Sequence, residues 1–437
     1  MHYRLFVSIV FGLMTACSSE PDNTLSPIRV EIEKTESGYR LLRGGEPYTV
    51  RGAGMGLDDI QRFAAAGGNS IRNWSTLQRG QDTRALLDAA HAHGVTVALG
   101  LPMRPERHGF DYDDADAVAT QLALMRGEVL KYRDHPAVLV WVIGNELNHG
   151  YGNPRVYDAV NAVAEMIHEL DPYHPTTTTT SGFKPDVNAQ ILARAPALDF
   201  ISFQMYGSLF RFTDRLAETG FDAPFMVTEW GTIGYWETAK TDWGAPIEVH
   251  SSEKAETFLI AYRDILAPLD GQLLGSYAFY WGQKQERTPT WFGMLTEDGN
   301  LTEVVDAMQY SWTGEWPENR TPLVETLLLD GKNAWESVRL VAGQTYEAIF
   351  DVLDPNGDAI AYRWELKPES TATSGGGDYE EPLPTLEGFL SDPAAAKTVL
   401  RSPAPGKYRL FAYASDPQGR VAHANIPFLV ESDAALE

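Results

Sequence analysis

The chain has 437 residues, of which 43% are hydrophobic, 22% charged and 11% aromatic, a composition that excludes a disordered, collagen-like or multi-span membrane protein. Its length suits one large domain followed by a small one. Sixty acidic against 35 basic residues leave a formal charge of -25, which repels nucleic acid and anionic membrane surfaces and favours a neutral or cationic ligand.

The N-terminus predicts export. One positive charge precedes an apolar run over 5–14 that is too short to span a bilayer but suits a secretory signal. The stretch MTACSS around Cys17, the only cysteine, resembles a bacterial lipoprotein signal. We therefore expect a signal peptide with lipidation at Cys17 over 1–17, a tether over 18–27 and an outer-membrane lipoprotein. Plain secretion with an incidental cysteine is the alternative.

Residues 28–317 alternate short β-branched runs with amphipathic stretches, which is typical of βαβ units around a parallel sheet. Eight strands are expected, at 48–52, 69–73, 95–101, 138–145, 176–181, 199–204, 225–229 and 275–281. An eightfold alternation predicts an α/β fold, the (β/α)8 TIM barrel. Before it, a hairpin over 29–33 and 39–42 is expected to close the barrel floor.

Residues 318–437 lack a long helical period, and we expect a small all-β sandwich there. The tetrads DPNG at 354–357 and DPQG at 416–419 match type I turns. This part resembles the immunoglobulin-like modules appended to many exported hydrolases. The Gly- and Ser-rich stretch 369–382 is predicted to be a loop.

The sequence has only weak motifs for metal or cofactor binding, and we expect the protein to bind neither a metal nor a cofactor. A calcium site at Asp351, Asp354 and Asp358 is conceivable, but turn-forming aspartates are the favoured interpretation. His91 and His93 have no further ligands at a useful spacing, so a metal there is disfavoured.

Two glutamates terminate apolar runs. The run 138–144 is followed by Asn145 and Glu146, and 225–228 by Glu229. In such a barrel, catalytic groups sit at the C-terminal ends of strands, here the fourth and the seventh. The pair resembles the active site of clan A retaining glycoside hydrolases, particularly families 2 and 5. The resemblance implies that Glu146 is the acid/base, that Glu229 is the nucleophile and that Asn145 binds the sugar 2-hydroxyl.

The same resemblance implies three supporting residues at other strand ends. Arg72 would hydrogen-bond the nucleophile, Tyr206 would orient it, and Trp281 would form the aromatic floor of the sugar subsite. Residues expected to line further subsites are Trp74, Gln283 and Trp291.

These residues predict a retaining β-glycoside hydrolase that cleaves a neutral β-linked oligo- or polysaccharide, with β-glucan favoured. Retention requires two carboxyl groups about 5 to 5.5 Å apart, one nucleophilic and one acidic. A transglycosylase on the same glycans, or a non-catalytic carbohydrate-binding lipoprotein, is the alternative. The expected partner is a carbohydrate, without nucleic acid, and membrane contact is expected only through the lipid anchor.

Overall fold

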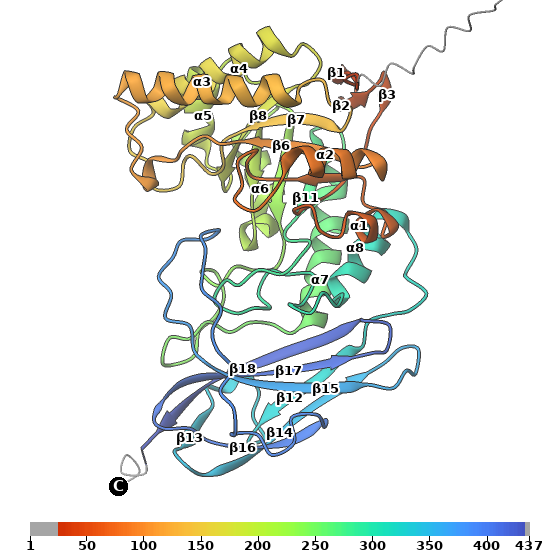
Figure 1. Ribbon diagram of the computed structural model, residues 1–437, viewed down its shortest axis with the longest axis vertical. Coiled ribbons are helices and arrows are strands. Elements are labelled where there is room, and N and C mark those ends of the chain that lie inside the picture. The colour runs from red at the N-terminus through yellow and green to blue at the C-terminus, as the bar shows by residue number, and fades with distance from the viewer. Residues whose placement is uncertain (1–24, 433–437) are drawn as a thin grey trace, which may run out of the picture.

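The computed structural model describes residues 25–432, so the expected signal peptide, Cys17 and most of the tether lie outside the described part. Within that part the chain forms a barrel and, after it, a β-sandwich (Figure 1). None of the helices in 25–432 has the length and apolar character that crossing a membrane requires.

The barrel is built from eight parallel strands, and the expected TIM barrel is confirmed. In space the strands follow the closed order β10-β11-β4-β5-β6-β7-β8-β9. Their bounds are β4 (Val50–Gly54), β5 (Ser70–Arg72), β6 (Thr96–Leu101), β7 (Val138–Ile143), β8 (Thr176–Ser181), β9 (Phe200–Gln204), β10 (Phe225–Trp230) and β11 (Leu273–Ala278). Because all are parallel, their carboxyl ends gather at one mouth of the barrel.

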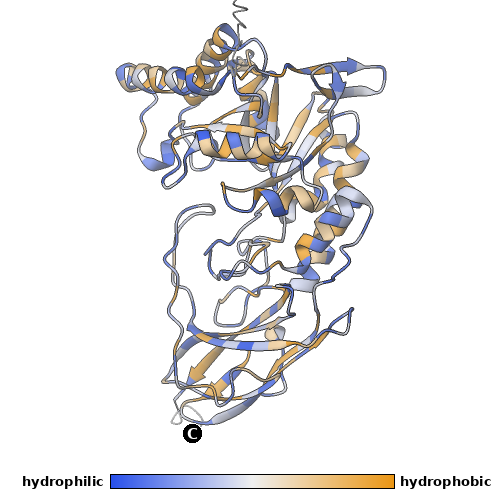
Figure 2. Ribbon diagram, turned by 45° about the vertical axis from the view of Figure 1, so that its right-hand side comes forward, coloured by the Kyte–Doolittle hydropathy of each residue, from blue (hydrophilic) through white to orange (hydrophobic). Residues whose placement is uncertain are grey.

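One α-helix follows each barrel strand and packs on its outside. In α4, for example, Val156, Val160 and Val163 are buried at a spacing of three to four residues. In Figure 2 the barrel strands are accordingly largely apolar, whereas the helices carry both apolar and hydrophilic residues. The bounds are α1 (Ile60–Ala65), α2 (Thr83–Ala92), α3 (Ala115–Tyr132), α4 (Arg155–Leu170), α5 (Pro185–Arg194), α6 (Phe212–Thr219), α7 (Ser251–Ile260) and α8 (Glu303–Thr313).

An antiparallel hairpin lies at the amino-terminal end of the barrel. It consists of β1 (Val30–Thr35) and β2 (Gly38–Arg43), with β3 (Glu46–Pro47) paired beside β2. Its buried Val30 and Leu41 pack in one cluster with barrel residues such as Met226. This floor closes one end of the barrel, so a ligand must enter from the mouth at the other end.

The second domain is a sandwich of two sheets around its own apolar core. One sheet has the order β12-β14-β16 and the other β13-β18-β17-β15. The bounds are β12 (Leu323–Leu329), β13 (Arg339–Val341), β14 (Thr345–Leu353), β15 (Ala361–Pro368), β16 (Lys397–Arg401), β17 (Gly406–Ser415) and β18 (Val421–Glu431).

The two predicted Asp-Pro turns of the sandwich meet in space. Carboxylate oxygens of Asp354, Asp358 and Asp416 lie within 4.8 Å of one another, whereas Asp351 is not in this group. Asp354 and Asp416 each accept two backbone N–H groups of their own turn, at 2.8 to 3.0 Å. These bonds give both aspartates the turn-forming role that the sequence favours.

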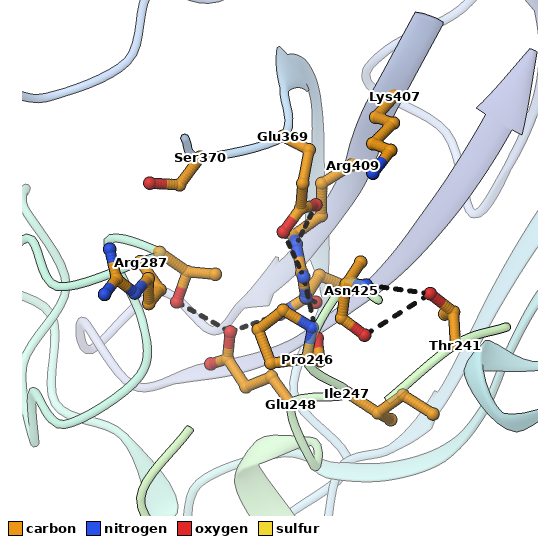
Figure 3. A network of polar contacts seen from close by, with 12 residues as sticks. Thr241, Pro246, Ile247, Glu248, Arg287, Glu369, Ser370, Lys407, Arg409 and Asn425 are labelled. Atoms are coloured by element: carbon orange, nitrogen blue, oxygen red, sulfur yellow. Dashed lines mark hydrogen bonds and ion pairs between the residues drawn. The ribbon is translucent and has the colours of Figure 1, made fainter. Parts of the chain in front are cut away.

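A buried polar network fastens the sandwich to the barrel (Figure 3). Glu248, in the segment between β10 and α7, accepts hydrogen bonds from Lys254 Nζ at 2.5 Å and from Asn425 Nδ2 at 2.7 Å. Arg409 in turn donates to Asn425 Oδ1 at 2.7 Å and to both carboxylate oxygens of Glu369, at 2.7 and 2.9 Å. Because such charged groups are buried only when they are paired, the network fixes how the domains meet.

Candidate active site

Two glutamates from separate strands line one cavity at the mouth of the barrel. Glu229 is the last residue but one of β10, and Glu146 follows β7 after Gly144 and Asn145. The cavity has a volume of about 940 Å³, and both carboxylates contribute to its wall. The structure therefore brings together the pair that the strand ends predicted.

Glu229 is held by three hydrogen-bond donors. Its Oε1 accepts from Arg72 Nη1 at 2.5 Å and from Trp74 Nε1 at 2.7 Å. Its Oε2 accepts from the Tyr206 hydroxyl at 2.9 Å. Burial and the nearby carboxylates raise the pKa of Tyr206, so this hydroxyl remains a proton donor. The three contacts fix the carboxylate in one orientation at the cavity wall.

Glu146 has a different environment. Burial, and then the charge of Glu229, raise the pKa of Glu146 to about 8, although cations such as Arg107 act in the opposite direction. At neutral pH its carboxyl group is therefore mainly protonated. Glu146 also has a positive φ of 47°, and its backbone N–H donates to Thr179 Oγ1 at 3.2 Å. A non-glycine residue in this left-handed region is strained, which is common at functional sites.

Asn145 links the two sides of the site. Its Oδ1 accepts from Arg72 Nη2 at 2.5 Å and from Gln204 Nε2 at 2.7 Å. Because the oxygen is occupied twice, the Asn145 side-chain amide nitrogen is left as the group able to donate to a ligand. Gln204 was not predicted from the sequence, although it is the last residue of β9 and a barrel of this kind carries its site residues at strand ends.

The cavity wall is rich in aromatic rings and in charged groups. Of the residues expected around the substrate, Trp74, Asn145, Tyr206 and Gln283 line it, and Arg72 lies behind Glu229. The unpredicted lining residues include the aromatics Tyr235, Phe279 and Tyr280 and the cations Arg107, Lys184 and Arg215. Apolar rings beside convergent polar groups suit a ligand with both C–H faces and hydroxyls.

Two expected subsite residues lie elsewhere. Trp281 is only 2% exposed and packs in the core against Phe63, at 5.2 Å between ring centroids, and against Trp312. The sequence placed it at the end of a strand, but β11 ends at Ala278, and the next residues turn to bond the loop around Phe292. Phe279 and Tyr280 face the cavity instead, so the placement of Trp281 was wrong.

Trp291 is also buried, at 1% exposure, and lies outside the cavity wall. Its indole N–H donates to the backbone carbonyl of Ile233 at 3.0 Å, and its ring packs on Tyr235 and Phe292. It supports the rim from behind, which corrects the expectation that it contacts a ligand.

The site falls in a segment with a recognisable family signature. Residues 85–234 match the family model described as glycosyl hydrolases family 2, TIM barrel domain. This segment contains both Glu146 and Glu229.

Comparison with individual proteins agrees at the level of the fold. The chain is 23% identical over 211 residues to the probable mannan endo-1,4-beta-mannosidase A-1 of Aspergillus terreus. This alignment covers 40% of this chain and 52% of that protein. The solved beta-D-glucuronidase of Dictyoglomus thermophilum matches with a TM-score of 0.51 and 17% identity over 67% of this chain and 54% of that one. The beta-glucuronidase of Faecalibacterium prausnitzii matches with a TM-score of 0.50 and 17% identity, over 65% of this chain and 52% of that one. The chain thus spans about half the length of these relatives.

Proposed function

We propose that the protein is a retaining glycoside hydrolase that acts on β-linked sugars, with Glu229 as nucleophile and Glu146 as general acid and base. One observation carries this proposal: two carboxyl groups share a cavity in unequal environments. Glu229 accepts three hydrogen bonds, one of them from the buried Arg72, whereas burial raises the pKa of Glu146. Retaining glycosidases require this division between a charged and a protonated carboxyl group.

In the first step, a Glu229 oxygen attacks the anomeric carbon while the Glu146 proton passes to the glycosidic oxygen. The bond between that oxygen and the anomeric carbon breaks, the leaving sugar departs as an alcohol, and a glycosyl ester forms on Glu229. Arg72, Trp74 and Tyr206 hold the attacking group still, which reduces the entropic part of the barrier.

In the second step, water cleaves the ester. Once Glu229 is esterified it carries no charge, so the repulsion that raises the pKa of Glu146 disappears. Ionised Glu146 then takes a proton from water, whose oxygen attacks the anomeric carbon on the face that the leaving group occupied. Two inversions give net retention, and both carboxyl groups return to their initial states.

The substrate class that we propose is a β-linked oligosaccharide. The sequence favours a β-glucan, whereas the names of the similar proteins add mannan and glucuronides as candidates. The cations Lys184 and Arg215 line the cavity. Two such cations favour testing an acidic sugar beside the neutral ones.

The test of this proposal is a product analysis. Purified protein is incubated with mannan, with β-1,3-, β-1,4- and β-1,6-glucans, and with 4-nitrophenyl β-glucoside, β-mannoside and β-glucuronide. NMR of the first product is expected to show the β-anomer. An α-anomer would contradict the double displacement, and binding without turnover would leave a carbohydrate-binding protein. Longer glycans among the products would indicate transglycosylation.

Substitutions at the two glutamates separate their roles. Glu229→Gln is expected to abolish turnover of 4-nitrophenyl glycosides without loss of fold, because the amide cannot form the ester. Glu146→Ala is expected to retain turnover where the leaving group needs no proton, and to be rescued by azide. The matched control is Glu256→Gln, at an exposed position on α7, which should behave as the parent.

A further inference from the structure

A loop of the sandwich takes part in the catalytic cavity. We call residues 370–381 the strap; it leaves the end of β15 and returns beside it, where Leu386 N donates to Leu366 O at 2.7 Å. Although it belongs to the second domain, its residues Gly375, Gly376 and Gly377 line the cavity with Glu146 and Glu229. Figure 1 shows this part of the chain rising in blue from the sandwich toward the barrel.

One side of the strap is held by the loop that follows β11. The Arg287 guanidinium donates to the carbonyl oxygens of Ala372 and Ser374, the latter at 3.1 Å, and its backbone N–H donates to Glu380 Oε2 at 2.6 Å. Glu380 is almost fully buried, and it also pairs with the guanidinium at 3.1 Å. Glu286 Oε1 accepts from Gly377 N at 3.4 Å. This is a firm, mostly buried attachment.

The tip of the strap reaches residues on the other side of the mouth. Asp378 Oδ1 lies 3.4 Å from Arg107 Nη1 and 3.6 Å from His108 Nε2, both in the segment after β6. A methyl group placed on Gly375 would come within 3.7 Å of His149 Nε2, which follows β7. These contacts are fewer and more exposed than those around Arg287.

The order of the strands shows that the strap crosses the mouth. In the closed order β10-β11-β4-β5-β6-β7-β8-β9, β11 stands four places from β7, and β10 four places from β6. In a ring of eight these are opposite positions. The strap contacts the loop after β11 at one side and the segment after β6 at the other, and it lies close to Trp236 after β10 and to His149 after β7. Because Glu229 lies near the end of β10 and Glu146 follows β7, the strap spans the two sides that carry the catalytic pair.

We propose that the strap is a specificity-determining element that excludes internal segments of a polysaccharide and admits chain ends and short oligosaccharides. The inference rests on the proposed function. An internal segment needs a groove that is open along its length so that the polymer can descend into it sideways. A bridge between opposite sides of the mouth blocks this approach, whereas a chain end passes beneath it. The glycines at 375–377 line the cavity without side chains, which leaves room for a sugar beneath the strap.

The strap can be shortened without removing its contacts with Arg287, which involve Ala372, Ser374 and Glu380. Ser374 Oγ donates to Glu380 Oε1 at 2.6 Å, so these residues lie side by side and a two-residue Asn-Gly turn can replace 375–379. The probes are soluble mannan, soluble β-glucan and the 4-nitrophenyl glycosides. The shortened protein is expected to lower the viscosity of polymer solutions. The ratio of its rate of polymer cleavage to its rate of aryl-glycoside cleavage is expected to be about tenfold higher than that of the parent. A cooperative thermal transition with a melting temperature close to that of the parent shows that the shortened protein is folded.

A point variant gives a second test. Asp378→Ala removes the contacts with Arg107 and His108. It is expected to raise polymer cleavage relative to aryl-glycoside cleavage, by less than the shortened strap does. Its control is Tyr379→Ala, because Tyr379 is 80% exposed and its hydroxyl bonds only Glu381. The inference is overturned if the parent already cuts polymers internally, or if shortening leaves the profile unchanged while aryl glycosides are still cleaved. If the parent cleaves no glycoside at all, it is the proposed function that fails, and the strap inference falls with it.

Discussion

The guanidinium group of Arg72 donates to Glu229 through Nη1 and to Asn145 through Nη2, both at 2.5 Å. One fully buried cation at the end of β5 thus fixes a residue of β10 and a residue that follows β7. The planar guanidinium suits this role because it presents several donors in a fixed geometry, which a lysine cannot do.

Arg72→Lys therefore tests geometry at constant charge. We expect kcat to fall by about a hundredfold or more, because hydrogen bonds to charged groups contribute about 1.5–3 kcal/mol. Steady-state kinetics on a 4-nitrophenyl glycoside measures this change. Arg263→Lys, on an exposed arginine paired only with Asp264, is the control. Equal kinetics of Arg72→Lys and the parent would show that the paired contacts are dispensable.

Tyr206→Phe removes one of the three donors to Glu229 and nothing else from the carboxylate. The expected effect is a fall in kcat of about 10- to 100-fold. Tyr277→Phe is the matched control, since its hydroxyl is buried and bonds Ser70 inside the barrel, away from the cavity. It should lower the melting temperature without changing kcat. A similar loss of kcat in both variants would mean that the Tyr206 effect is structural.

The raised pKa of Glu146 predicts a pH dependence. Because the general acid must be protonated, kcat/KM on glycosides with poor leaving groups should fall as pH rises through about 8. In Glu146→Ala, measured on an activated aryl glycoside, this fall of kcat/KM at alkaline pH, the alkaline limb of the profile, should vanish. An unchanged limb in that variant would assign the titration to another group.

The same shift predicts an effect on stability. A carboxyl group whose pKa is raised from 4.5 to about 8 on folding favours the folded state below pH 4.5, and this contribution is lost as pH rises toward 8. Glu146→Gln cannot ionise, so its melting temperature should exceed that of the parent at pH 8 and approach it near pH 4. Thermal denaturation across this range measures the difference. A constant gap at all pH values would contradict the assignment.

The N-terminal prediction is separately testable. If Cys17 is lipidated, cells expressing the full chain should incorporate labelled palmitate into it and retain it in the membrane fraction. Cys17→Ser should abolish both. Labelling of the Cys17→Ser protein would place the modification elsewhere, and absence of label from the parent would support plain secretion.

The sequence was sufficient where a signal is local. Glu146 and Glu229 each terminate an apolar run, and a parallel barrel brings such ends together, so the pair could be predicted before any coordinates. The error at Trp281 arose because strand pattern does not reveal where a strand stops, and neighbouring residues face opposite ways. The stretch 369–382 was correctly predicted as a loop. Its contact with Arg287, more than 80 residues earlier in the chain, is tertiary and leaves no local pattern.

The central claim is that Glu229 attacks the sugar, and covalent trapping tests it most directly. A 2-deoxy-2-fluoro β-glycosyl fluoride of the sugar that the product analysis identifies should inactivate the protein with time and leave one glycosyl group per chain. Mass spectrometry of the digested protein is predicted to find that group on Glu229. A label on any other residue, or rapid turnover of ordinary substrate with no label at all, would contradict the account.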